Sequence, residues 1–114
     1  MALNEELMRW AGALAEALET SKGKRSFVEC LELAEQVVND LALRHTLKIV
    51  RNIVAQGCSL SRAMERFPEV FNPVIITVVR YGEIYGELDL TLRRFAERPE
   101  DLEPKCALKT SVQP

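Results

Sequence analysis

Apolar side chains recur along the first segment of this chain at every third or fourth position, which is the repeat of an α-helix. Spacings of i, i+3, i+4, i+7 and i+11 place side chains on one helical face, and here they belong to Leu7, Trp10, Ala11, Leu14 and Leu18. Asn4 can cap this helix, and Glu5 and Glu6 would occupy its first turn, where the helix dipole favours acidic groups. The pattern therefore predicts a first helix that begins after Asn4.

Two further helices are predicted between residues 26 and 56. Ser26 and Glu29 have the spacing of a capping box, in which each side chain accepts a hydrogen bond from the other residue's backbone N–H. This helix is expected to end near Asn39, with an apolar face of Phe27, Cys30, Leu31, Ala34 and Val38. Asp40 can cap the next helix, which is expected to run to Gln56 with an apolar face of Leu43, Leu47, Val50 and Val54.

Glycine, serine and proline mark the boundaries of a short fourth helix. Gly57 can adopt the positive φ that ends the preceding helix, and Ser59 can cap the new one. Pro68 stops this helix, and its inward face is Leu60, Ala63, Met64 and Phe67. Because the order of glycine, serine and apolar residue also occurs from Gly23 to Phe27, the sequence predicts two similar three-helix halves.

The segment 74–79 is ambiguous, because its run of β-branched residues favours a strand on propensity alone. We nevertheless expect a helix, since Asn72 is a good cap, Pro73 fits the first helical position, and no other segment offers a partner strand. Gly86 would end this helix, and a sixth helix follows with an apolar face of Leu88, Leu92 and Phe95. The predicted fold is an all-α six-helix bundle over residues 1–98.

The composition fits one small globular domain and argues against some classes of function and structure. The chain has 114 residues, of which 47% are apolar and 28% charged, as in ordinary soluble domains. Its net charge of −2 argues against a nucleic-acid partner, which requires a concentration of basic groups. The odd number of cysteines indicates free thiols rather than a disulfide framework, and these residues are Cys30, Cys58 and Cys106.

No residue pattern indicates catalysis, so we expect a protein that is not an enzyme and has no catalytic, cofactor-binding or metal-binding residue. His45 is the only histidine, and its place beside Arg44 favours a solvent-facing side chain over a catalytic base. Cys58 precedes a helix start but lacks a partner base, so it is expected to be a small packed side chain. Nucleophile elbows and phosphate-binding glycine loops are also missing from the sequence.

A set of motifs in residues 57–89 resembles one protein family. They are Gly57, Ser59-Leu60, Ala63-Met64, Phe71-Asn72-Pro73, Gly82-Glu83, Gly86 and Leu88-Asp89. In this order and spacing they resemble the cytoplasmic domain of the type II secretion system F family, which includes inner-membrane platform proteins of type IV pilus assembly. Met64 stands where leucine is usual, and Asn72 is inserted as a cap. A looser similarity begins upstream at Gly23.

The resemblance implies a scaffold domain with no chemistry of its own. Its implied partners are the assembly ATPase and other inner-membrane subunits of a secretion or pilus machine, with a homodimer as a further option. The parent protein would lie in the bacterial inner membrane with this domain facing the cytoplasm. No apolar run of the chain reaches the roughly 20 residues that span a bilayer. The chain is therefore expected to be soluble as given, with residues 99–114 a linker toward a membrane segment absent from it.

Glu83 is the acidic residue with two competing interpretations. It interrupts an apolar helix between Gly82 and Gly86, and we favour a structural role in which it caps or bridges neighbouring helices. The functional alternative is a carboxylate presented to a partner subunit, or a weak divalent-ion site shared with Ser59 or Asp89. A lone carboxylate cannot hold calcium, which takes about six or more oxygen ligands.

Several alternatives remain open from the sequence. The domain could be a free-standing helical adaptor or, less favoured, a helix-turn-helix regulator built on residues 59–79. A tetratricopeptide array has a similar period, but its aromatic and proline pattern is missing. Three aromatic residues could be interface anchors, although core packing is the favoured interpretation for Trp10, Tyr81 and Tyr85.

Overall fold

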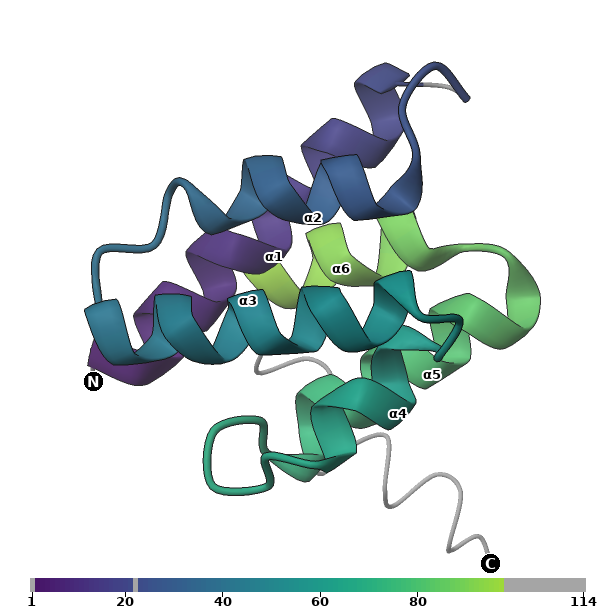
Figure 1. Cartoon of the computed structure of the whole chain (residues 1–114). Coiled ribbons are helices and arrows are strands. Elements are labelled where there is room, and N and C mark those ends of the chain that lie inside the picture. The colour runs from purple at the N-terminus through teal and green to yellow at the C-terminus, as the bar shows by residue number, and fades with distance from the viewer. Residues whose placement is uncertain (1, 22, 98–114) are drawn as a thin grey trace, which may run out of the picture.

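The computed structural model describes residues 2–21 and 23–97, and their side chains from residue 5 onward. These described residues form six helices and no strand. The helices are α1 (Ala2–Ser21), α2 (Phe27–Glu35), α3 (Leu41–Ala55), α4 (Leu60–Glu65), α5 (Pro73–Tyr85) and α6 (Leu88–Glu97) (Figure 1). The predicted all-α class is confirmed, including the helix at 74–79. The predicted linker at 99–114, with Cys106, lies outside the described residues.

The helices pack mainly against their neighbours in the sequence, and α6 returns to pack against α1. Figure 1 shows α2 and α3 lying alongside each other, with α4 and the α5–α6 hairpin following from the end of α3. Helices α1 and α6 pack closely at Gly12. A Cβ added at this residue would lie 3.3 Å from the Cβ of Ala96. A two-bond ion pair from Arg93 to Glu19 joins the same two helices. The contact between α1 and α6 thereby closes the bundle.

The core consists of the inward faces of all six helices. Trp10 of α1 is buried and its ring packs against that of Phe71, with ring centroids 6.4 Å apart. Burial of these apolar faces is the main force that holds short helices together, since isolated helices of this length are marginal in water. None of the described helices is both long enough and apolar enough to cross a membrane.

Local capping chemistry sets most helix boundaries as predicted. Ser26 and Glu29 form a complete capping box, and Asp40 and Asn72 each accept a backbone N–H three residues ahead. Gly57 and Gly86 have φ angles of 107° and 69°, which favour glycine over residues with a side chain. The arrangement into two similar halves stays a prediction.

Two predicted boundaries were wrong. Helix α1 begins at Ala2, so Asn4 lies inside it, because the preceding alanine and leucine are strong helix formers. Helix α2 ends at Glu35 rather than near Asn39. There the guanidinium of Arg44 donates to the carbonyls of Glu35 and Gln36, and tighter i→i−3 hydrogen bonds carry the chain through Val38. The first error arises because helix propensity outweighs the capping tendency of Asn4. The second arises because contacts from Arg44 of α3 influence where α2 ends.

The capping box of α2 gives a first testable prediction. Replacing Ser26 with alanine removes the acceptor for the Glu29 N–H and should lower the free energy of unfolding by about 1 kcal/mol. Ser26→Asp keeps an acceptor at the same position and serves as the control, with a change within about 0.5 kcal/mol. Urea denaturation measures both values, and equal losses in the two variants would show that capping is not the cause.

Candidate functional site

The segment from Gly82 to Gly86 forms the tight junction between α5 and α6. A Cβ added at Gly82 would lie 2.5 Å from Oγ1 of Thr91 and 2.6 Å from the Cα of Leu88. Only a residue without a side chain permits α6 to pass α5 at this distance. The Gly82 carbonyl also accepts hydrogen bonds from the backbone N–H groups of Gly86 and Glu87. The two glycines therefore build the junction, one by close packing and the other by its left-handed backbone.

Glu83 binds the start of α4. One carboxylate oxygen accepts the backbone N–H of Ser61 at 3.0 Å, and the other accepts the Ser61 hydroxyl at 2.7 Å. Ser61 is only 3% exposed, so its polar groups have little access to water. Ser59 accepts the N–H of Arg62 in the same first turn. Two unpaired N–H groups of α4 are thus satisfied, one by its own cap and one by Glu83 from α5.

Glu83 therefore bridges α5 and α4, as the structural interpretation of this residue predicts. Both of its oxygens accept hydrogen bonds from Ser61, a residue that sequence reasoning did not single out. Among the described residues, no group of three or more histidine, cysteine, aspartate or glutamate side chains is placed to hold a metal ion. The alternative of an ion site that Glu83 shares with Ser59 or Asp89 stays a hypothesis.

Several other motif residues lie near this junction. Leu60 is buried beside Ser61, Leu88 contacts the Gly82 position, and Asp89 stands in the first turn of α6. Pro73 occupies the first turn at the opposite end of α5. An ion pair between Arg80 and Glu65 also joins α5 to α4. The motif residues from Gly82 to Asp89 therefore meet the start of α4 at the corner of α4, α5 and α6, while Phe71, Asn72 and Pro73 stand at the opposite end of α5.

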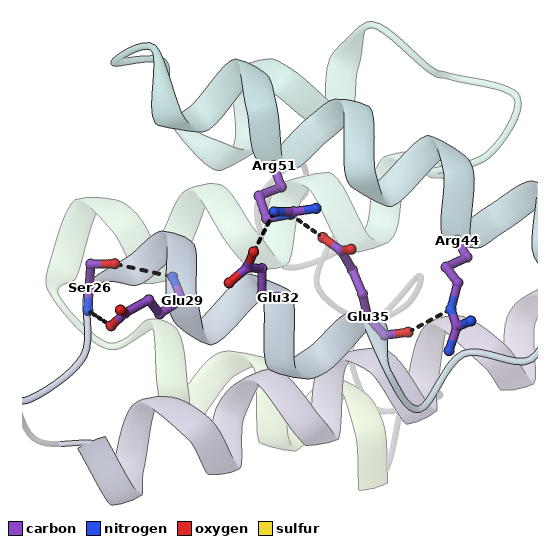
Figure 2. Close-up of polar contacts among 6 residues, drawn as sticks. All are labelled: Ser26, Glu29, Glu32, Glu35, Arg44 and Arg51. Atoms are coloured by element: carbon purple, nitrogen blue, oxygen red, sulfur yellow. Dashed lines mark hydrogen bonds and ion pairs between the residues drawn. The ribbon is translucent and has the colours of Figure 1, made fainter.

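A second polar cluster, which sequence reasoning missed, joins α2 to α3 (Figure 2). The guanidinium of Arg51 donates to Glu35 at 2.7 Å and to Glu32 at 2.8 Å. The Nε of Arg44 donates to the Glu35 backbone carbonyl at 3.3 Å. The spacing of acids at i and i+3 on one helix and arginines at i and i+7 on the next was the available signal. It could not reveal which of these charges face one another.

Burial dominates the electrostatics of Glu35. It raises the pKa of this carboxyl above the ordinary value of 4.5, although the hydrogen bond and charge of Arg51 act in the opposite direction. A raised folded-state pKa means that the folded protein binds this proton more tightly than the unfolded chain does. The contribution of Glu35 to stability is therefore fully present below pH 4.5 and is lost as pH rises through the folded-state pKa.

This sign gives a prediction for the Glu35→Gln variant, whose side chain cannot ionise. The stability of the native protein minus that of the variant should decrease as pH is raised from below 4.5, the ordinary pKa of this carboxyl, through its raised folded-state pKa. Urea denaturation at several pH values in constant salt measures this difference. A difference that increases with pH would show that Arg51 outweighs the burial of Glu35, and a constant difference would show that the two effects cancel. Either result would contradict the prediction.

Aromatic and apolar side chains are exposed on the last turns of α5. Tyr81 is 52% exposed and Tyr85 is 63% exposed, with their rings 4.6 Å apart, and Ile84 between them is also exposed. The core-packing interpretation is therefore right for Trp10 and wrong for the two tyrosines. The prediction failed because α5 is apolar on nearly all sides, and only the tertiary packing decides which side is covered.

The other candidate residues lie as expected from the sequence. His45 is exposed on α3, and Cys30 and Cys58 are free thiols, the first buried and the second half-buried.

Comparison with known proteins identifies the same family as the motif resemblance does. A family model described as "Type II secretion system (T2SS), protein F" matches residues 13–103. The type IV pilus assembly protein PilC of Myxococcus xanthus is 28% identical over 81 residues, which cover 68% of this chain and 19% of that protein.

Two further relatives are each named type II secretion system protein F. The one from Vibrio cholerae is 33% identical over 73 residues, which cover 64% of this chain and 18% of that protein. The one from Pseudomonas aeruginosa is 32% identical over 74 residues, which cover 65% of this chain and 18% of that protein. The chain therefore spans about a fifth of the length of these curated relatives.

Proposed function

The chain belongs to the type II secretion system protein F family, and we propose that it is a scaffold domain of a platform protein in type II secretion or type IV pilus assembly. The observation that carries the proposal is the family match over residues 13–103 together with the motif corner of α4, α5 and α6. In that corner the polar motif residue Glu83 is occupied by bonds within the domain. Because Glu83 stabilises the fold of the domain, we expect partners to bind to other residues, on the outer surface.

The proposed partners are the assembly ATPase and neighbouring inner-membrane subunits. The parent protein would be embedded in the bacterial inner membrane, with this domain on the cytoplasmic side where an ATP-driven motor works. The names of the relatives, which refer to type II secretion and to pilus assembly, support a role in one of these machines. A role without catalysis is part of the same proposal.

A capture experiment tests this function. The immobilised 114-residue chain is incubated with the purified cognate assembly ATPase, and separately with the purified cytoplasmic parts of the neighbouring membrane subunits. We expect retention of at least one of these proteins over a bead control. Retention of none of them, with the domain shown to be folded by circular dichroism, would contradict the proposal and favour a free-standing adaptor.

A second copy of the domain is the occupant that we propose for the exposed face of α5. The three side chains Tyr81, Ile84 and Tyr85 are uncharged, so two copies can meet on this face without like-charge repulsion, and a two-fold interface brings the same patch from each copy together.

The variant Ile84→Ser/Tyr85→Ser should weaken self-association at least tenfold in sedimentation experiments. Leu41→Ser removes an exposed leucine elsewhere and should leave association unchanged. Equal behaviour of both variants would rule out this face.

The helix-turn-helix alternative has little support from the charges of its second helix. Helix α5 carries one cation, Arg80, and that cation is paired with Glu65. A helix that enters a DNA groove relies on several cations for phosphate contacts.

A further inference from the structure

Helix α3 carries positive charge only, and it packs beside α2, whose charged residues are all acidic. The 114-residue chain has a net charge of −2, yet α3 contains no aspartate or glutamate and has Arg44, Lys48 and Arg51 as its charged residues. Leu41, Arg44, His45 and Lys48 are spaced i, i+3, i+4 and i+7, so they share one helical face. All four are exposed, and we refer to them as the α3 face. This face begins at the helix N-terminus, where the dipole adds positive potential.

The acids near the α3 face bond to other groups, and Asp40, which caps α3 beside Leu41, accepts the backbone N–H of Leu43. The charge of Lys48 acts on the carboxyl of Glu35 without forming an ion pair with it. Glu32 and Glu35 are both paired with Arg51 (Figure 2). Glu29 accepts the backbone N–H of Ser26 in the capping box. Arg44 donates to backbone carbonyls, which carry no formal charge. Within the described part of the chain, neither Arg44 nor Lys48 has an ion pair with a carboxylate.

The α3 face also borders a hollow and includes an exposed apolar side chain. A hollow of about 350 Å³ is lined by Glu35, Leu41, Arg44, His45, Lys48 and Arg51. It adjoins a larger hollow of about 600 Å³ between α2 and α3, which shares Glu35, Arg44 and Arg51 with it. Leu41 is 76% exposed, the largest value for a large apolar side chain in the described residues. A side chain with this exposure beside a hollow provides a contact that a partner can cover.

We propose that the α3 face docks an acidic amphipathic segment of a protein partner, with an apolar side chain against Leu41 and carboxylates against Arg44 and Lys48. This inference rests on the proposed scaffold function, since it describes the chemistry of one docking partner. Two exposed ion pairs and one apolar contact support a weak interaction, with a dissociation constant of about 10 µM to 1 mM.

A protein segment fits this face better than a membrane or a nucleic acid does. Recognition of anionic lipid usually uses clusters of about four to eight cations, and DNA binding uses a similar or larger number of phosphate contacts. The α3 face offers two permanent cations, Arg44 and Lys48. An exposed leucine at the edge of a hollow instead matches the way an amphipathic helix places an apolar side chain in a groove.

Titration of the ¹⁵N-labelled 114-residue chain tests the proposal. The probe is an alanine-based helical peptide that carries one leucine with glutamates three, four and seven positions later, and the comparison peptide has glutamine in place of each glutamate. We expect amide shifts concentrated at residues 41–48 with the glutamate peptide, and at least tenfold weaker binding of the glutamine peptide. No shifts at residues 41–48 with millimolar glutamate peptide would overturn the proposal.

Two variants separate docking on this face from general attraction to acids. Leu41→Ser/Lys48→Gln should weaken peptide binding at least tenfold and leaves the Arg44 contacts in place. Leu90→Ser/Arg94→Gln removes one exposed leucine and one exposed cation from α6 and should leave binding unchanged. Equal losses in both variants would overturn the proposal.

Vesicles and the ATPase capture experiment complete the test. Vesicles with 30% phosphatidylglycerol should not shift residues 41–48, and binding to vesicles without binding to the peptide would assign the face to membrane instead. If the assembly ATPase is captured while the peptide leaves the α3 face unchanged, the scaffold function stands and this docking chemistry fails. If the peptide binds but no secretion or pilus subunit is captured, the scaffold function fails.

Discussion

Replacing Gly82 with alanine is expected to lower the free energy of unfolding by about 3 kcal/mol, the upper part of the range for overpacked cores. The added methyl group would lie 2.6 Å from the Cα of Leu88, which is backbone and cannot move without shifting α6. It would also lie 2.5 Å from Oγ1 of Thr91. Chemical denaturation followed by circular dichroism measures the loss, and a change below about 0.5 kcal/mol, as at an ordinary surface site, would contradict the close packing.

Two further variants give this prediction its controls. Gly12→Ala adds a methyl group that meets only the Ala96 side chain, at 3.3 Å. Both glycines lie inside helices, so both substitutions gain about 1 kcal/mol of helix propensity. The milder contact at Gly12 should therefore make its net loss much smaller. Thr91→Ala combined with Gly82→Ala removes the clash with the side chain but keeps the clash with the backbone. It should therefore restore only part of the stability, and complete restoration would mean that Thr91 alone requires the glycine.

Replacing Glu83 with alanine is expected to cost about 2 to 3 kcal/mol, because the N–H and hydroxyl of the buried Ser61 lose a charged acceptor. Glu83→Gln keeps one acceptor oxygen without the charge and should lose about half as much. Glu87→Ala changes an exposed glutamate on the same segment and should stay within about 0.5 kcal/mol. Thermal or urea denaturation measures all three variants, and equal losses for Glu83→Ala and Glu87→Ala would show that the bond to Ser61 contributes nothing.

The helix pattern could be predicted from the sequence because its determinants are local. A capping side chain acts on an N–H only two or three residues away, and a positive φ depends on a single residue. Ser26, Asp40, Ser59 and Asn72 therefore marked helix starts correctly, and Gly57 and Gly86 marked helix ends. Asn4 failed because an equally local competitor, the propensity of the residues before it, favoured a longer helix.

The details of the site could not be predicted, since they depend on how the helices align. The bond of Glu83 to Ser61 requires the register of α5 against α4, which no pattern within either helix specifies. The pairing of Arg51 with Glu32 and Glu35 requires the register of α3 against α2. For the same reason the exposure of Tyr81 and Tyr85 was not predicted, because α5 is apolar around most of its circumference and several orientations were compatible with its sequence.

The central claim of this account is that the Gly82–Glu83 motif acts inside the domain as the joint between α4, α5 and α6, which leaves the outer surface for partners. A double-mutant cycle of Ser61→Ala and Glu83→Ala tests it most directly, because the cycle isolates the energy of the pair from other effects of each change. We expect a coupling energy of about 1.5 to 3 kcal/mol, typical of hydrogen bonds to a charged group. Additive effects, with a coupling near zero, would contradict the claim and return Glu83 to the role of a carboxylate presented to a partner.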